Sequence, residues 1–416
     1  MKVVMKREAL RPLPCLLAAI VPLLPVRAQE WTRFHGSGGT ALAPGIPAKF
    51  GESDFAWKAE LPGNGVSSPV AWGQRVFVTS ETESGGRALL CYDLAGGKLQ
   101  WKLDDKFEAH GKHRFNSFAS STPVVDAERV YLTWTSGGNF LALAADHEGR
   151  KQWQVDLGAY AEDHGSGASP VLAGGVLVVV KDSVGADGFL AGLSPADGRT
   201  LWKVARKSDR TPFSTPVTFE ESPGVWRVIF SSNPAALTCL DPATGKVIWQ
   251  HDNPQPEQRP VSSPVIADGV CFATVGQGGK ANAAVAVRIK DGSLAWEGGK
   301  GLPYVPTPVS SGKHFFLLSD GGILSSVEAA TGKQLWSERV FSDQAYSSPV
   351  HTGDRIVCIS RSGKVAVVAA NPDSFQLLGS SELGDPCDAT PALAGGRLVI
   401  RTARRLLCLT GSRPQP

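Results

Sequence analysis

Residues 241–250 read DPATGKVIWQ, and residues 328–336 carry nearly the same phrase, EAATGKQLW. Both place an acidic or polar turn, a glycine and a basic residue ahead of a tryptophan. Looser copies follow the same order: DLAGGKLQW (93–101), DHEGRKQW (146–153), SPADGRTLW (194–202) and KDGSLAW (290–296). Recurrence over about half of the chain indicates a repeat architecture, which decides the fold before any single motif does.

A second phrase recurs independently: a small residue, then Pro, usually followed by Val. Its copies are SSPV (67–70), STPV (121–124), ASPV (168–171), STPV (214–217), SSPV (262–265), PTPV (306–309), SSPV (347–350) and ATPA (389–392). The prolines stand at 69, 123, 170, 216, 264, 308, 349 and 391, so neighbouring copies lie 41 to 54 residues apart. Eight units of this size predict eight propeller blades, each of four strands.

The residues inside each unit favour strands. A glycine turn after the proline phrase leads into β-branched runs such as VFVTS (76–80), VLVVV (176–180) and IVCIS (356–360). Runs of this length between turn residues indicate strands and hairpins. Glycine in the TGK phrase accepts a positive φ, and the tryptophan that follows is a large apolar plate suited to docking between blades. The predicted docking residues are Trp57, Trp101, Trp153, Trp202, Trp249, Trp296 and Trp336, with Leu377–Leu378 in the eighth place.

The two ends of the repeat complete each other. The last unit stops at LLCLTG (406–411), which is a third strand, and FAWKAEL (55–61) is a tryptophan strand that precedes the first unit. We therefore predict an all-β, eight-bladed propeller whose ring is closed by the N-terminal strand 55–61, a closure that leaves no open sheet edge. On this basis a chain that lacks residues 29–54 should still form the ring.

The N-terminus predicts export. Four basic residues precede the short apolar stretch CLLAAIVPLLPV (15–26), and Arg27-Ala28-Gln29 suits cleavage near Ala28. The stretch is too short and too interrupted by proline for a membrane span, although an uncleaved anchor is the alternative. The expected location is periplasmic or extracellular. The domain prediction is 1–28 signal peptide, 29–54 extended leader, 55–411 propeller and 412–416 C-terminal tail.

The net charge of +3, without a long basic run, argues against a nucleic-acid partner. Repeats that bury their core locally can build one large domain, and we expect a monomer.

The phrase D-x-x-T-G-K-x-x-W, clearest at 241–249, resembles the tryptophan-docking motif of the pyrroloquinoline quinone (PQQ)-like β-propeller repeat family, and the resemblance covers residues 55–411. Two branches of that family imply different functions. Quinoprotein dehydrogenases bind the quinone and calcium on the propeller axis, whereas a non-enzymatic propeller lipoprotein belongs to the machinery that assembles outer-membrane β-barrels. The leader WTRFHGSGG (31–39) also resembles the start of a secreted group of such propellers, with His35 in place of Arg.

This sequence departs from both branches. It has no adjacent Cys-Cys pair, which quinoprotein dehydrogenases carry beside the quinone, and it lacks their inserted loops. Cys15 follows Pro14 and opens the apolar stretch, so no lipobox is present.

Candidate site residues fall in the loops that join each tryptophan strand to the next proline phrase, because these loops gather on one face. His110 and His113 have metal-ligand spacing, and His164 lies in the neighbouring loop, so zinc or copper is one hypothesis. Asp163, His164 and Ser166 suggest a nucleophile and its base. A polar loop explains both patterns more simply, and we predict no catalytic residue and no metal.

We predict instead that this face binds a partner, because aromatic and charged side chains at a concave mouth suit protein contacts. The residues assigned to that role are His110, Lys112, His113, Arg114, Phe115, Asn116, Phe118, His164, Arg206, Arg210, Tyr304 and Tyr346. The predicted function is an exported, non-catalytic scaffold that binds a protein or peptide, in cell-envelope assembly, without a cofactor. The alternatives are a PQQ- or metal-dependent oxidoreductase and a sensor of small ligands.

Overall fold

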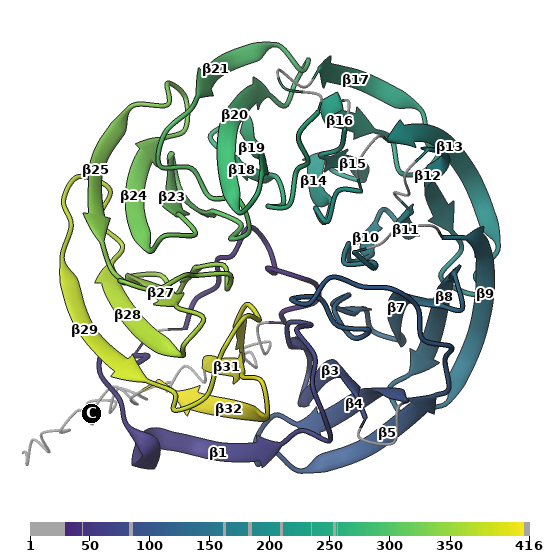
Figure 1. The fold of residues 1–416 in the computed structure, drawn as a ribbon, viewed down its shortest axis with the longest axis horizontal. Helices are drawn as coiled ribbons and strands as arrows, with labels where there is room; N and C mark the ends of the chain where they lie inside the picture. Colours follow the sequence, from purple (N-terminus) through teal and green to yellow (C-terminus); the bar gives the residue numbers. More distant parts are fainter. Residues whose placement is uncertain are drawn as a thin grey trace, which may run out of the picture.

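A computed structural model describes residues 30–43, 45–82, 86–160, 164–181, 185–208, 211–233, 235–252, 255 and 257–411. These residues form eight four-stranded antiparallel sheets arranged as blades around one axis (Figure 1). The predicted eight-bladed propeller is confirmed. The predicted signal peptide, 1–28, and the predicted tail, 412–416, lie outside the described residues.

The first four blades follow one another along the chain, each from its innermost to its outermost strand. Blade 1 comprises β2 (Val70–Trp72), β3 (Arg75–Glu81), β4 (Arg87–Asp93) and β5 (Leu99–Asp105). Blade 2 comprises β6 (Val124–Val125), β7 (Arg129–Ser136), β8 (Asn139–Asp146) and β9 (Lys151–Ala159). Blade 3 comprises β10 (Val171–Ala173), β11 (Val176–Lys181), β12 (Gly185–Leu193) and β13 (Thr200–Ser208). Blade 4 comprises β14 (Val217–Ser222), β15 (Val225–Phe230), β16 (Ala235–Leu240) and β17 (Val247–Asp252).

The remaining blades repeat this order until the last. Blade 5 comprises β18 (Val265–Ala267), β19 (Val270–Gln277), β20 (Lys280–Arg288) and β21 (Leu294–Gly298). Blade 6 comprises β22 (Val309–Ser311), β23 (His314–Leu318), β24 (Ile323–Glu328) and β25 (Gln334–Arg339). Blade 7 comprises β26 (Val350–His351), β27 (Arg355–Ile359), β28 (Lys364–Ala369) and β29 (Leu377–Glu382). Blade 8 comprises β30 (Ala392–Ala394), β31 (Arg397–Arg401), β32 (Arg405–Thr410) and, from the start of the chain, β1 (Phe55–Glu60), which follows the short 3-10 helix η1 (Glu52–Asp54).

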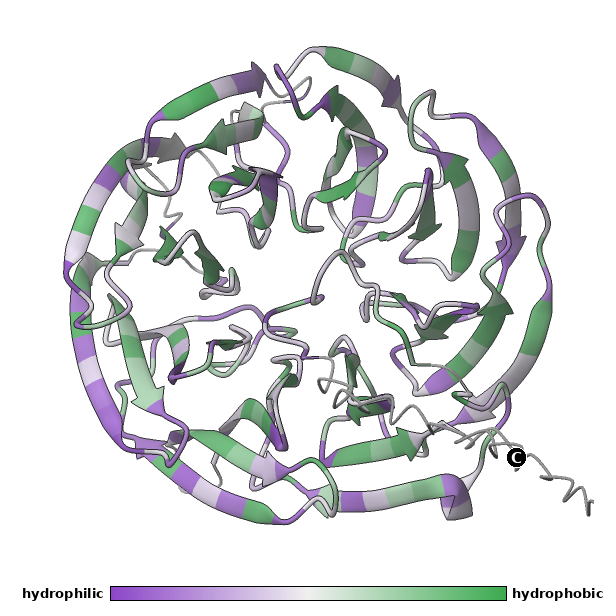
Figure 2. Ribbon diagram, turned by 180° about the vertical axis from the view of Figure 1, so that it is seen from behind, coloured by the Kyte–Doolittle hydropathy of each residue, from purple (hydrophilic) through white to green (hydrophobic). Residues whose placement is uncertain are grey.

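Strand β1 closes the ring, as the sequence predicts. It pairs antiparallel with β32, so that Trp57 lies opposite Cys408 and Ala59 opposite Leu406. The middle strands are almost entirely buried because each blade packs its two faces against its neighbours. The outer strands alternate between exposed and partly buried residues. Figure 2 shows hydrophilic and hydrophobic residues alternating along these rim strands.

The proline phrases hold the inner strands together. The backbone N–H of the small residue before each proline donates to the hydroxyl of its counterpart in the next blade, at 2.9 to 3.1 Å. The eight residues of this hydroxyl ring are Ser68, Thr122, Ser169, Thr215, Ser263, Thr307, Ser348 and Thr390, whose N–H returns to Ser68. The repeated Ser or Thr is therefore explained by a closed ring of hydrogen bonds around the axis.

The TGK phrase and the tryptophan belong to one contact between neighbouring blades. Trp249 of blade 4 donates from Nε1 to the carbonyl of Ile289 in blade 5 at 2.9 Å. Its ring lies against Gly292, where φ is +72° and an added Cβ would come within 2.7 Å of the ring. Glycine is thus required both for the turn and for the close approach. The same hydrogen bond, at 2.7 to 3.1 Å, is made by Trp57, Trp101, Trp153, Trp202, Trp296 and Trp336.

The N-terminal leader (residues 30–54) supports the contact between blades 7 and 8, which has no tryptophan. The backbone N–H of Phe50 donates to Ser381 Oγ at 2.9 Å. The Phe50 ring is buried and packs edge-on against Phe55 at 5.8 Å. The leader passes so close to β29 that a Cβ at Gly379 would lie 2.4 Å from the carbonyl oxygen of Ala48.

The leader also crosses the axis at the end opposite the loops that join the blades, and Figure 1 shows it passing behind the centre. Trp31 exchanges two backbone hydrogen bonds with Ala71 of blade 1, while Ser310 of blade 6 donates to Gly38 and Ala41 donates to His351 of blade 7. Trp31 is only 1% exposed. The predicted formation of the ring without residues 29–54 stays a prediction, and these contacts indicate that such a ring would lose stability.

In the part of the chain that the structure describes, no helix has the length and apolar character needed to cross a membrane.

Candidate functional site

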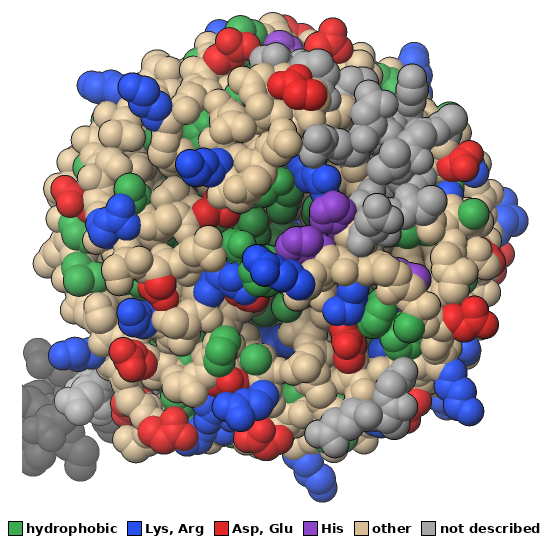
Figure 3. Space-filling view, viewed as in Figure 1, with side chains coloured by type: hydrophobic (Ala, Val, Ile, Leu, Met, Phe, Trp, Pro, Cys, Tyr) green, Lys and Arg blue, Asp and Glu red, His purple; other side chains and the backbone are tan. Residues whose placement is uncertain are grey.

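The loops that join the blades surround a hollow of about 700 Å³ on the propeller axis. Its floor includes the hydroxyl ring, and its walls include Phe213, Tyr304 and Tyr346, while Phe34 of the leader also lines it. Figure 3 shows hydrophobic side chains inside this central hollow and histidines at its edge. The hollow lies on the face that the sequence assigns to binding.

One long loop bridges the mouth of this hollow. Residues 106–118, here called the strap, leave blade 1 after β5, and the ring of Phe115 lies 6.2 Å from that of Tyr346, which precedes blade 7. The Arg361 guanidinium lies 4.5 Å from the Phe115 ring centre and 4.2 Å from that of Tyr346. Arg361 is held in turn by Asp388 through two hydrogen bonds of 2.8 and 3.1 Å. The strap is therefore anchored by stacking at Phe115.

The strap separates the larger hollow from a smaller one of about 290 Å³ between blades 8 and 1. Phe115 and Asn116 line both hollows. Figure 3 shows a band of cationic side chains between the two depressions.

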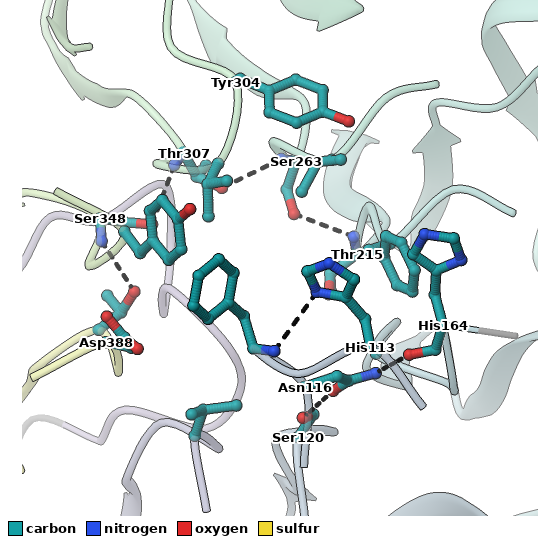
Figure 4. A pocket seen from close by; sticks show the side chains of 18 of the residues that line it. His113, Asn116, Ser120, His164, Thr215, Ser263, Tyr304, Thr307, Ser348 and Asp388 are labelled. Carbon is teal, nitrogen blue, oxygen red and sulfur yellow. Dashed lines mark hydrogen bonds between the residues drawn. The ribbon is translucent and has the colours of Figure 1, made fainter. Parts of the chain in front are cut away.

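Hydrogen bonds fix the part of the strap that surrounds Asn116, next to Phe115. Asn116 Nδ2 donates to the carbonyls of His164 and Ser166 at 2.7 and 3.1 Å, and Figure 4 shows the first of these bonds. Lys112 Nζ donates to the carbonyl of Asn116 at 2.9 Å. The backbone N–H of His113 also donates to the carbonyl of His164. A polar loop of this length is positioned by these contacts rather than by regular structure.

The three histidines of the metal hypothesis do not converge. His113 and His164 stack with ring centres 5.3 Å apart and an angle of 10°, whereas His110 contacts Thr135 Oγ1 at 2.5 Å and the edge of Phe118. Parallel rings point their nitrogens side by side rather than towards one ion. Among the described residues no group of three or more His, Cys, Asp or Glu side chains has the arrangement of a metal site. Asp163, of the nucleophile hypothesis, lies outside these residues.

Burial lowers the pKa of His113, and the nearby His164 and Arg114 lower it further. These effects favour the neutral form of His113, which presents a flat ring to the hollow.

A buried carboxylate fixes the wall that carries Tyr304. Asp320 accepts from the backbone N–H groups of Tyr304 and Val305 at 2.6 and 3.2 Å. Burial raises the pKa of Asp320 to about 6, while these two hydrogen bonds act in the opposite direction. The carboxylate is thus mostly ionised at neutral pH, and it holds this loop as a preformed wall.

The structure distributes the residues assigned to partner binding among several places. The larger hollow is lined by His113, Phe115, Asn116, His164, Tyr304 and Tyr346, and the smaller one by Lys112 and Arg114 as well. His110 and Phe118 lie within the strap, where their rings pack in a T-shaped arrangement. The Arg206 guanidinium of β13 lies 4.4 Å from the centre of the Phe230 ring. Arg210 lies outside the described residues. Sequence reasoning missed the contributions of Phe34, Asp320 and Arg361, because Phe34 lies on the leader and the other two follow the ends of strands in blades 6 and 7.

Comparison with known proteins identifies the family. The family model described as outer membrane protein assembly factor BamB matches residues 52–212, 186–307 and 285–374. The chain belongs to this family. It is 23% identical over 310 residues to the outer membrane protein assembly factor BamB of Moranella endobia, covering 72% of this chain and 70% of that protein. It is 26% identical over 287 residues to BamB of Yersinia pestis, covering 64% and 67%.

Solved structures share the fold at lower identity. BamB from Moraxella catarrhalis has a TM-score of 0.66 and 15% identity, over 86% of this chain and 98% of that one. A europium-containing methanol dehydrogenase has a TM-score of 0.69 and 10% identity, over 91% and 89%. At these identities the likeness establishes the propeller and leaves function to the site.

Proposed function

We propose that this protein is an exported, non-catalytic propeller that binds polypeptide segments during outer membrane protein assembly. The family and its relatives in Moranella endobia and Yersinia pestis, which are outer membrane protein assembly factors, support this process. The shape and the lining of the larger hollow support the binding of polypeptide segments.

The hollow has the properties of a polypeptide-binding mouth. A volume of about 700 Å³ can receive a few side chains of an extended segment. Phe213, Tyr304 and Tyr346 give it rigid aromatic walls, and such residues supply much of the binding energy at protein interfaces. Gln277 and Gln344 at its edge can exchange hydrogen bonds with a peptide backbone.

The same lining argues against a quinone site. A planar cofactor with three carboxylates requires several cationic partners that converge on the axis. Among the described residues that line the larger hollow, Arg259 is the arginine and Asp388 the carboxylate, and Asp388 is already bound by Arg361. The hydroxyls of the floor each accept a hydrogen bond from a neighbouring blade. The quinoprotein-like oxidoreductase is therefore the weaker hypothesis.

Complementation tests the proposed function. Deletion of the gene in its own organism should lower the abundance of outer-membrane β-barrel proteins, and the wild-type chain should restore it. The double variant Phe115→Ala/Tyr346→Ala should fold, because Phe115 is 42% exposed, but should restore less than half of the wild-type effect, since the aromatic contacts at the mouth are lost.

The matched control is Leu294→Ala/Leu377→Ala, which removes two exposed apolar side chains from the outer strands. It should complement fully. Full complementation by the Phe115/Tyr346 variant would contradict the assignment of this face to function.

A further inference from the structure

The smaller hollow lies above an arginine with an unusual environment. Arg401, the last residue of β31, is completely buried. Its Nη1 donates to Thr79 O at 2.6 Å, Ser67 Oγ at 2.7 Å and Ser67 O at 3.1 Å. Its Nε and Nη2 make no hydrogen bond within the described part of the chain.

A second buried arginine, Arg87, has the carboxylate partner that Arg401 lacks. Arg87 is also fully buried, but its Nε bonds Asp105 Oδ2 at 3.0 Å, and its guanidinium stacks on Trp134 and Phe107. No carboxylate of the described residues lies within ion-pair distance of Arg401. Because a buried charge is costly without a counter-charge, the unpaired Arg401 requires an explanation that Arg87 does not.

The hollow above Arg401 carries further positive charge. Lys112 and Arg114 of the strap line it, and neither forms an ion pair with a described carboxylate. Of the two carboxylates in its lining, Asp388 is bound by Arg361, whereas Glu81 accepts from the N–H of Phe118 at 2.7 Å and raises the pKa of Arg401 by its charge without forming an ion pair with it. Gly65 packs closely against the Arg401 guanidinium, because a Cβ there would lie 2.3 Å from Nη2.

We propose that the smaller hollow is a carboxylate-binding site. Lys112 and Arg114 donate the hydrogen bonds to the carboxylate, and Arg401 acts from beneath the floor through a charge that no ion pair within the described residues neutralises. Burial lowers the pKa of Arg401 only to about 10, so this charge is present at neutral pH.

The carboxylate can belong to an acidic group of a polypeptide or to a small free acid. The polypeptide source rests on the proposed function, because the two hollows share Phe115 and Asn116 and one extended segment could enter both. A segment with an acidic residue near an apolar one fits this pair of hollows.

Titration calorimetry and thermal unfolding of the mature chain test the site with two sets of probes. The free-acid arm compares sodium acetate with acetamide at constant ionic strength. The polypeptide arm compares peptides that contain one Glu with the same peptides carrying Gln. We expect acetate, but not acetamide, to raise the unfolding temperature, and Glu peptides to bind about tenfold more tightly than their Gln counterparts.

Substitutions test whether carboxylate binding depends on the residues of the smaller hollow. Lys112→Gln/Arg114→Gln, on partly or fully exposed side chains, should bind acetate and Glu peptides about tenfold more weakly without loss of stability. Arg401→Gln should weaken binding although both surface cations remain. The control Arg199→Gln/Lys246→Gln removes two exposed cations from turns at the rim and should bind like the wild type.

The outcomes separate the site from the proposed function. Equal binding of Glu and Gln peptides, with no effect of acetate, would overturn the carboxylate site and leave polypeptide binding intact. Acetate binding that depends on Lys112 and Arg114, with no binding of either peptide, would support the site and contradict the proposed function. An acetate effect that persists in the Lys112/Arg114 variant would overturn the site.

Discussion

Trp249→Ala is expected to lower the free energy of unfolding by about 3–5 kcal/mol, as for other large-to-small aromatic changes in a core. The ring is 8% exposed and packs between blades 4 and 5. The variant loses this packing and leaves the carbonyl of Ile289 without the indole N–H. It also opens a cavity beneath Gly292, whose turn is built around the ring.

Urea unfolding followed by circular dichroism measures this loss. Leu294→Ala, in the next blade, removes a side chain that is 44% exposed and should change the stability by less than about 1 kcal/mol. Wild-type stability of Trp249→Ala would show that the contact between blades does not depend on the tryptophan.

Removal of residues 29–61 is expected to abolish the soluble, closed ring. This deletion takes away β1, so β32 becomes an open edge with its buried row Leu406–Leu409 exposed to pairing with other chains. The shorter deletion of residues 29–54 keeps β1 but removes Trp31, Ile46 and Phe50, which are all buried. At about 1.5–3 kcal/mol for each large apolar side chain, it should remain soluble and lose several kcal/mol of stability.

Sedimentation after expression and thermal unfolding distinguish the two truncations. Solubility of the longer deletion equal to that of the shorter one would indicate closure by another segment. A wild-type melting temperature for the shorter deletion would contradict the structural role of the leader.

The architecture could be predicted because its causes repeat along the sequence. Each blade needs a turn, a strand start and a docking residue at the same spacing, so eight weak signals reinforce one another. The hydroxyl ring could not be foreseen, since the partner of Ser68 is Thr122, a full blade away in the sequence. The packing of Trp31 and Phe50 was missed because the leader has no strand period, and its contacts are with blades distant in sequence.

The gathering of these loops around one hollow could also be predicted, because antiparallel topology places all loops of one kind at one end of the axis. His113 and His164 could be expected to lie close together, because they belong to neighbouring loops on the same face. The contact of Phe115 with Tyr346 and Arg361 depends on the path of the strap across the mouth, which no local pattern encodes. Arg401 ends a strand whose sequence pattern predicts only a buried core strand. The absence of an ion-pair partner for Arg401 among the described residues is therefore visible only in the structure.

The central claim is that the looped face receives polypeptide segments, and site-specific photocrosslinking in the cell envelope tests it most directly. Benzoylphenylalanine at Phe115, at the mouth of the larger hollow, should form covalent adducts with outer-membrane proteins or their assembly partners. The same probe at Leu42, which is 70% exposed on the leader at the opposite end of the axis, should form few. Adducts at Leu42 but not at Phe115 would contradict the account.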